Sequence, residues 1–275
     1  MIQSNFLFFG TAFVLLQLLP GVVGWGKEDH YAVCKIAEEI AITQVEIKIG
    51  VPSVELTTIP CSYRIISAPL QNGNVITITL VLYSAAVPQL LFIFLYVLEC
   101  DINKIFTSLN TDNLTEALMF LSHFIGDAHQ PLHAGFRGDL GGNTISVHWF
   151  GLQTNLHRVW DNMIIETAMK SFYNSDLAIM IESINKNITD TWSEDIILWE
   201  NCTSINTICP DPYASESIDL ACKYAYKGAT PGSTLSDEYF LSRLPIVEKR
   251  LAQAGVRLAS TLNRIFKTQM LISEA

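Results

Sequence analysis

The sequence predicts a mainly α-helical single domain, a helical bundle with one short β-hairpin. Three observations lead to this prediction. Apolar residues recur at helical spacing through most of the chain after residue 112. The segment GDLGGNTISVHWFG, residues 138–151, combines glycines with alternating apolar residues, which is typical of a turn and a hairpin. The 275 residues, 49% of them hydrophobic, can bury a substantial core and lie close to the upper size of one domain.

Residues 1–24 are interpreted as a signal peptide. A hydrophobic run of the right length precedes Val22 and Gly24, which are small residues placed as before a cleavage site. No Lys or Arg precedes the run, so a membrane anchor is the alternative. Cleavage after Gly24 would leave residues 25–275 as one domain in the secretory pathway. Three glycosylation sequons agree with that route, at Asn113, Asn187 and Asn201.

The six cysteines suit an oxidising compartment. Six cysteines allow fifteen pairings, and the sequence does not choose among them. We expect Cys202, Cys209 and Cys222 to take part in disulfide bonds that cross-link one loop-rich region.

The mature chain would begin WGKEDHYAVCKIAEEIA, residues 25–41, in which apolar residues recur at helical spacing. A free α-amine at Trp25, together with the carbonyl oxygen of the same residue, can chelate a metal ion in a five-membered ring. His30 lies at the start of the helical pattern. Taken alone, these residues favour a packed Trp25 and a His30 in the start of a helix over a pair of metal ligands.

Residues 113–130 predict a helix that ends before Pro131. His123 and Asp127 are four residues apart and therefore share one helix face. His133 follows the break and can turn back toward them. His129 and His148 are assigned structural or surface roles, and Asn143 a turn.

Residues 155–173 predict a helix that carries a second pair, His157 and Asp161, also four residues apart. A last helix is predicted over residues 238–266. Each pair alone is typical of hydrogen-bonded side chains on a helix surface. Two pairs together with His133 suit zinc, which accepts imidazole and carboxylate ligands, and a pair of such ions suits phosphoryl chemistry.

The formal charge of −10 argues against a basic groove that binds nucleic acid by neutralising many phosphates. If phosphate is bound, bound cations must attract it.

Six stretches of the chain resemble the plant bifunctional nucleases, relatives of the fungal single-strand-specific zinc endonucleases: WGKEDHYAVCKIAE, NLTEALMFLSHFIGDAHQPLH, GDLGGNTISV, NLHRVWDNMIIE, DPYASESIDLACKYAY and YFLSRLPIVEKRLAQAGVRLA. The resemblance covers residues 25–44 and about 112–267. It implies a phospholipase C-like helical fold and an extracellular or vacuolar glycoprotein. It also implies three zinc ions, hydrolysis of RNA and single-stranded DNA, and removal of 3′ phosphates from nucleotides.

The resemblance also implies which residues bind each ion. His133, His157 and Asp161 would hold one zinc. The amine and carbonyl of Trp25, with His30 and Asp127, would hold a second. His123 and Asp127 would contribute to a third, so that Asp127 bridges two ions and is the candidate catalytic residue.

The segment of about residues 45–111 departs from the family pattern. The family supplies there an Asp and a His that bind the third zinc, whereas this segment contains no histidine. The disulfide partner of Cys34 is also in question, and Cys61 is the nearest candidate. The alternative to an active nuclease is therefore a catalytically impaired zinc-binding homologue.

Within that segment, Val75 to Leu98 runs without a charge and is long enough to cross a bilayer. Any association with a membrane would run only through this stretch. Two origins are considered, namely a genuine insert and a gene model that reads non-coding sequence in place of the proper exon. We favour the second, because the flanks match the family closely and the segment does not.

Overall fold

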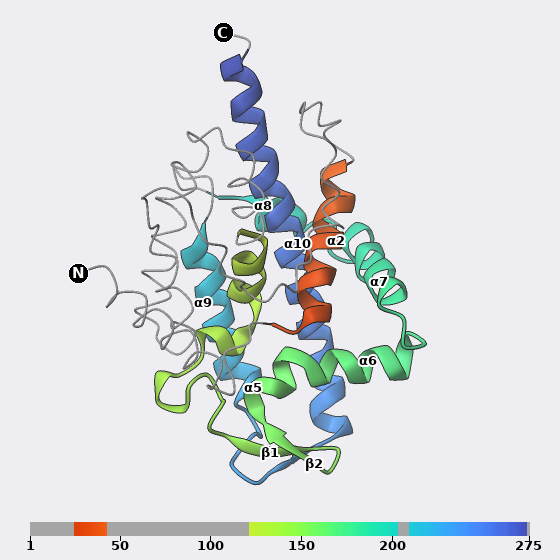
Figure 1. Ribbon diagram of the computed structural model, residues 1–275, viewed down its shortest axis with the longest axis vertical. Helices are drawn as coiled ribbons and strands as arrows, with labels where there is room; N and C mark the ends of the chain where they lie inside the picture. Colours follow the sequence, from red (N-terminus) through yellow and green to blue (C-terminus); the bar gives the residue numbers. More distant parts are fainter. Residues whose placement is uncertain (1–24, 43–120, 203–208, 274–275) are drawn as a thin grey trace, which may run out of the picture.

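The computed structural model describes residues 25–42, 121–202 and 209–273, and these residues are mainly helical, as predicted (Figure 1). Residues 121–129 are also helical. The other helical elements are α2 (Lys27–Ile42), η3 (Pro131–Ala134), η4 (Arg137–Asp139), α5 (Leu156–Arg158), η5 (Val159–Met163), α6 (Ile164–Phe172), α7 (Leu177–Thr189), α8 (Ile196–Glu200), α9 (Pro210–Leu220), η6 (Ala221–Ala225) and α10 (Asp237–Ser273).

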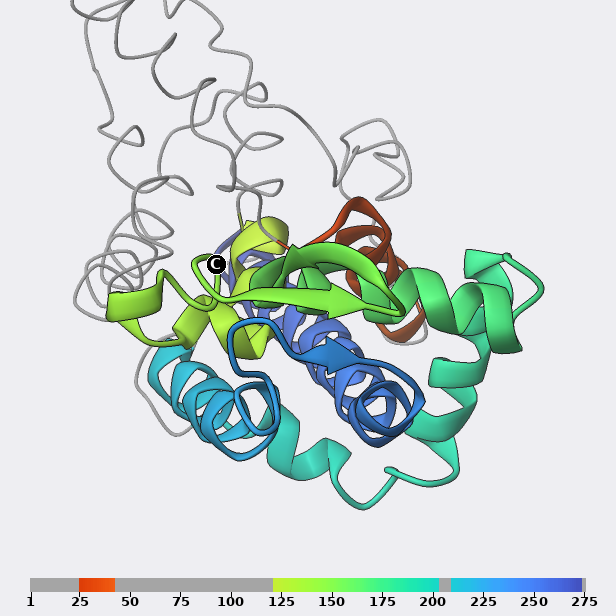
Figure 2. The same cartoon turned by 90° about the horizontal axis from the view of Figure 1, so that it is seen from below.

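The long helix α10 runs through the whole fold, and the other helices pack around it (Figures 1 and 2). Its most extensive contact is with α2. Gly255 makes this contact close, because a Cβ atom there would lie 2.3 Å from Cγ2 of Ile36. Pro245 is accommodated inside α10, although proline removes one backbone hydrogen bond of a helix. The helix predicted over residues 238–266 lies within α10, and its apolar residues Leu244, Val247, Leu251, Leu258 and Leu262, which recur at helical spacing, are buried.

The predicted hairpin is present as β1 (Ser146–Trp149) and β2 (Leu152–Asn155), which pair antiparallel with Val147 opposite Thr154. Phe150 and Gly151 join them with φ values of 47° and 85°. Positive φ at both positions matches a two-residue turn whose twist suits a hairpin. A third strand, β3 (Thr234–Leu235), pairs parallel to β1 and was not predicted. The three strands lie side by side across one end of the bundle (Figure 2).

The helix predicted over residues 155–173 is observed as three consecutive pieces. Asn155 caps its start by accepting a hydrogen bond from the backbone N–H of Arg158. A turn of π-helix, η5, then separates α5 from α6. Such turns are rare and occur frequently at functional sites. Here the π-helical turn contains Asp161.

A buried ionic cluster holds the C-terminal end of helix 121–129. Arg250 Nε donates to the carbonyl oxygen of His129 (3.0 Å), and Ser217 Oγ donates to that of Ala128 (2.6 Å). Arg257 Nη1 donates to Nε2 of His129 (2.9 Å), whose Nδ1 is therefore the protonated nitrogen and donates to the Ile125 carbonyl (2.6 Å). The structural role assigned to His129 is confirmed.

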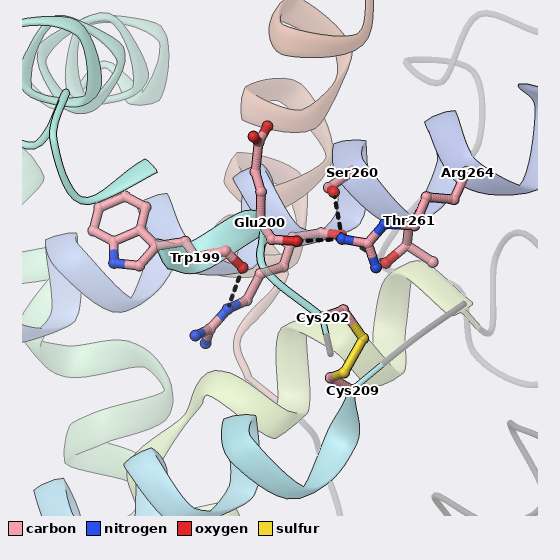
Figure 3. Close-up of a disulfide and its surroundings, with 8 residues drawn as sticks. Trp199, Glu200, Cys202, Cys209, Ser260, Thr261 and Arg264 are labelled. Carbon is pink, nitrogen blue, oxygen red and sulfur yellow. Dashed lines mark hydrogen bonds between the residues drawn. A yellow bond between two sulfur atoms is a disulfide. The ribbon is translucent and has the colours of Figure 1, made fainter. Parts of the chain in front are cut away.

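Cysteine pairing agrees with the prediction only in part. Cys202 and Cys209 form a disulfide beside the last turn of α8, but Cys222 is a free, exposed thiol, so the prediction that it staples the same region was wrong (Figure 3). Arg264 Nη2 donates to the Glu200 carbonyl at the end of α8, which ties this region to α10. Cys34 is disulfide-bonded, and its candidate partner Cys61 lies outside the described residues.

Several predictions fall on segments that the structure does not describe: the signal peptide of residues 1–24, the atypical segment of about 45–111, the apolar stretch Val75 to Leu98 and the sequon at Asn113. Among the described helices, none combines the length and apolar character that crossing a membrane requires.

Candidate metal centre

Helix 121–129 presents His123 and Asp127 on one face, as predicted. Nε2 of His123 lies 3.2 Å from Oδ2 of Asp127. Gln130 and Pro131 then end the helix: the Gln130 side chain accepts a hydrogen bond from the backbone N–H of Leu132, and η3 begins at Pro131. This tight turn brings His133 back toward the helix, with Nδ1 3.5 Å from Oδ1 of Asp127.

The N-terminal end of α2 meets the same carboxylate. The backbone N–H of Trp25 donates to Oδ1 of Asp127 (3.1 Å), and Nε2 of His30 also lies 3.1 Å from that oxygen. The rings of His30 and His123 stack with centroids 4.2 Å apart. Gly126 permits this approach, since a Cβ there would lie 2.8 Å from Nδ1 of His30. Trp25 and His30 are both buried, so the start of the mature chain would lie inside the protein.

The charge state of Asp127 follows from these neighbours. Burial alone would raise the pKa of its carboxyl group, but His123 and His133 outweigh that effect and hold the pKa well below its usual range. Asp127 is therefore a carboxylate with four nitrogen atoms within 3.5 Å of its two oxygens. Such a carboxylate can bridge two cations.

A second group lies next to the first and consists of His133, His157 and Asp161, all buried. Nε2 of His133 lies 3.2 Å from Oδ1 of Asp161, and Nε2 of His157 lies 3.2 Å from Oδ2. The two imidazole rings stack with centroids 5.0 Å apart and an interplanar angle of 5°. Because His133 contacts Asp127 through one ring nitrogen and Asp161 through the other, it joins the two groups.

Backbone and amide groups fix the orientation of this second group. The carbonyl oxygen of Gly141 lies 2.7 Å from Nδ1 of His157, so it accepts the proton there and leaves Nε2 unprotonated toward Asp161. Burial lowers the pKa of His157, which favours this neutral form. The side-chain amide of Gln130 donates to Oδ1 of Asp161 (2.7 Å). Gly141 has φ of +63°, and a Cβ there would lie 2.4 Å from the Leu132 carbonyl oxygen, so only glycine fits.

Both groups fit a divalent metal ion by their donor atoms. In the His30, His123, Asp127 group and in the His133, His157, Asp161 group, one ligand atom of each residue lies within 4.8 Å of the others. In the described structure neither ring nitrogen of buried His30 makes a well-directed hydrogen bond, although Nε2 lies close to Asp127. A buried polar atom without a partner is costly, and a metal ion would satisfy it. Two imidazoles and a carboxylate are a typical zinc donor set that leaves a position open.

All seven residues predicted as ligands thus lie in or beside these two groups: Trp25, His30, His123, Asp127, His133, His157 and Asp161. His148 lies in β1, outside both groups, and Asn143 is in the predicted turn, where its side chain donates to the Leu140 carbonyl. Two of the three predicted glycosylation sites lie within the described residues. Asn187 is half-buried in α7, and Asn201 is exposed directly after α8.

Sequence reasoning missed the supporting residues Gln130 and Gly141, and it missed Asp29. The only signal for Gln130 in the sequence was its position just before Pro131. Asp29 is buried beside Gly26, and neither of its carboxylate oxygens has a hydrogen-bond partner in the described structure. Burial, reinforced by the nearby Asp161, raises its pKa well above the ordinary value.

The S1/P1 nuclease family model matches residues 100–267. Endonuclease 4 of Arabidopsis thaliana is 50% identical over 289 aligned positions, which cover 95% of this chain and 95% of the relative. Endonuclease 2 of the same plant is 45% identical over 273 aligned positions, which cover 92% of this chain and 94% of the relative. Nuclease S1 of Aspergillus oryzae is 32% identical over 173 positions, 59% of this chain and 58% of the fungal protein.

Proposed function

The chain belongs to the S1/P1 nuclease family of phosphodiester hydrolases, and we propose that it is a zinc-dependent endonuclease of RNA and single-stranded DNA in the secretory pathway. The observation that carries this proposal is the environment of Asp127, whose carboxylate has four candidate nitrogen ligands around it. A carboxylate shared in this way, beside a second complete donor group, suits a cluster of metal ions rather than a single one. Removal of 3′ phosphates from nucleotides is part of the same proposal.

The proposed ligand assignment divides the residues among three ions. His133, His157 and Asp161 would hold one. The mature N-terminus at Trp25, with His30 and Asp127, would hold the second, and His123 with Asp127 would contribute to the third. Zinc bound in this way would supply an activated water near neutral pH and positive charge for the phosphate oxygens.

The chain's own residues have separate tasks around that cluster. Asp127 keeps its negative charge despite burial and holds two donor sets in register. Gly141 keeps the proton of His157 on Nδ1, and Gln130 fixes the rotation of the Asp161 carboxylate. Substitution of such supporting groups typically costs roughly 10- to 100-fold in metal affinity or activity.

Hydrolysis of labelled single-stranded DNA and RNA by the purified protein with excess zinc tests the proposal, with Asp127→Asn as the inactive variant and His148→Ala as the matched control. We expect cleavage of single strands that a chelator and Asp127→Asn both abolish, while His148→Ala cleaves normally. Equal cleavage by Asp127→Asn would contradict the proposed role of this residue.

The second candidate, a catalytically impaired zinc-binding homologue, is favoured by two observations on the segment of residues 45–111. Residues 45–111 contain no histidine, although the family pattern places a zinc ligand of that type there, and the family model match begins only at residue 100. The comparison that separates the candidates is between this chain and one in which residues 45–111 are replaced by a relative's segment. We expect the replacement to raise turnover strongly. Comparable turnover from both chains would show that the missing ligands are supplied from elsewhere.

A further inference from the structure

An exposed aromatic side chain stands in the loop that follows the metal ligand His133. Phe136 is 55% exposed, and its ring contacts that of Tyr226 with centroids 4.9 Å apart. The Tyr226 hydroxyl accepts a hydrogen bond from the backbone N–H of Phe136 (3.0 Å) and donates to Oδ1 of Asp139 (3.0 Å). These two hydrogen bonds of the Tyr226 hydroxyl, to Phe136 and to Asp139 in the same loop, hold the aromatic pair in place.

The same loop is part of the metal centre. Asp139 Oδ1 also accepts from the backbone N–H of Gly142 (2.8 Å), and the preceding residue, Gly141, orients His157. The packing of two helical turns also brings the aromatic pair close to the metal centre. The π-helical turn η6, which leads into Tyr226, packs directly against η3, which contains His133. A strand that reached the metal centre over this loop would pass Phe136.

Three positively charged residues adjoin the aromatic pair in the sequence, in a chain whose net charge is −10. Arg137 adjoins Phe136, and the sequence KYAYK places Lys223 and Lys227 on either side of Tyr226; all three cations are exposed. Within the described residues, none of the three forms an ion pair. Of the nearby acids, Asp139 is occupied by Tyr226 and Gly142, and Asp219, four residues before Lys223, does not pair with it. Lys223 Nζ lies over the ring of Tyr224, 5.3 Å from its centroid, so no carboxylate competes with a ligand for these charges in the described structure.

We infer that a single-stranded nucleic acid binds across this surface, defined by Phe136, Arg137, Lys223, Tyr226 and Lys227, on its way to the metal centre. The inference rests on the proposed function and names the residues that hold the strand. A base stacks on the exposed face of Phe136, and the three cations contact the neighbouring phosphates. Stacking on an aromatic side chain tolerates any base but requires a base that is free of its own stack, so the surface selects single strands over duplexes.

Equilibrium binding measures this directly. The probe is a fluorescein-labelled oligothymidylate with a phosphorothioate backbone, which resists hydrolysis, and anisotropy is read with the full, zinc-loaded protein. Phe136→Ala should weaken binding by roughly 10-fold or more, the typical effect of losing one base-stacking side chain. The matched control is Phe172→Ala, since Phe172 is an equally exposed aromatic (53%) on α6, far from this loop in sequence. That control should bind as the unmodified chain does.

The cations are tested by the salt dependence of the same binding. Lys223→Ala with Lys227→Ala should lower the slope of log affinity against log salt by about 0.7 for each phosphate that is no longer neutralised. Lys186→Ala, which removes an exposed lysine from α7, should leave the slope unchanged. Equal affinities for Phe136→Ala and Phe172→Ala, or duplex binding that depends equally on Phe136, would overturn the inference.

Failure of the inference is distinguishable from failure of the proposed function. If the chain cleaves single strands but Phe136→Ala binds them as well as before, the surface is wrong and the function stands. If Phe136→Ala weakens binding but neither this chain nor the one with residues 45–111 replaced hydrolyses any strand, the surface stands and the function is wrong. Zinc content measured on every variant shows that the metal centre is intact.

Discussion

The ionic cluster at the C-terminal end of helix 121–129 consists of Arg250, Arg257 and Glu216. It yields a quantitative prediction for Glu216→Gln. The carboxylate of Glu216 accepts three short hydrogen bonds, one from Arg250 and two from Arg257, each 2.6 Å long. Both arginines are buried, and burial lowers the pKa of Arg250 to about 10, so that it still carries its charge at neutral pH. Replacing the carboxylate by an amide leaves two buried positive charges without compensation.

The magnitude follows from how far solvent reaches the cluster. Removing one partner of a fully buried ion pair costs about 3–5 kcal/mol. The Glu216 side chain is 38% exposed, so water screens part of the interaction, and glutamine retains one acceptor. We therefore expect a loss of about 2–3 kcal/mol in the free energy of unfolding. Breaking the surface pair of Asp195 with Lys249 by Asp195→Asn should cost less than about 1 kcal/mol.

Urea unfolding followed by tryptophan fluorescence, at one fixed zinc concentration, measures both variants. A loss for Glu216→Gln no larger than that for Asp195→Asn would refute the reasoning, because it would mean that the buried arginines do not need this carboxylate. The variant should also bind zinc less tightly, since Arg250 holds the carbonyl end of the helix that carries His123 and Asp127.

Three further predictions concern metal content, pH and processing. His157→Ala should lower the zinc stoichiometry measured by elemental analysis, whereas His148→Ala should not, and equal zinc in the His157 variant and the unmodified chain would exclude His157 as a ligand. Burial, with Arg250 and Arg257 nearby, lowers the pKa of His129 well below its ordinary value of 6.5, so the unfolded state binds the extra proton and stability should fall as the pH drops below about 6.5. In His129→Asn that loss should shrink by up to about 1.4 kcal/mol per pH unit, and an unchanged pH profile would contradict the buried neutral state. Finally, N-terminal sequencing of the secreted protein should begin at Trp25, and any other start removes its α-amine as a ligand.

The sequence could predict those parts of the site that depend on local spacing. His123 with Asp127 and His157 with Asp161 are each four residues apart, and helical geometry alone then brings each histidine close to its aspartate. The break at Pro131 similarly indicated that His133 could turn back. Helical periodicity and the glycine-rich turn were also sufficient for the helices and the hairpin.

Contacts between distant segments could not be predicted in this way. Nothing in the sequence around Gly126 or Gly255 indicates which helix packs there, yet His30 and Ile36 of α2 depend on these two glycines. The two-residue strand β3 is too short to show a period, and its pairing with β1 depends on tertiary contacts. Without the resemblance to a family, His30 would have remained an ordinary helix residue.

The two candidate metal groups differ in how many of their ligands and supporting residues lie in the described part of the chain. This difference determines which group is affected by the segment of residues 45–111, which departs from the family pattern. The ligands of the His133, His157, Asp161 group are all buried, and their supports, Gln130 and Gly141, also lie within residues 121–202. In the other group His123 is 33% exposed, and the family pattern takes its remaining ligands from the departing segment. On the proposed assignment, a change confined to that segment would remove ligands from the third zinc position and leave the donor set of the first intact. We therefore expect that zinc binding and catalysis can separate in this chain, because one complete donor group would still hold an ion, while attack on a phosphodiester would require the neighbouring ions as well.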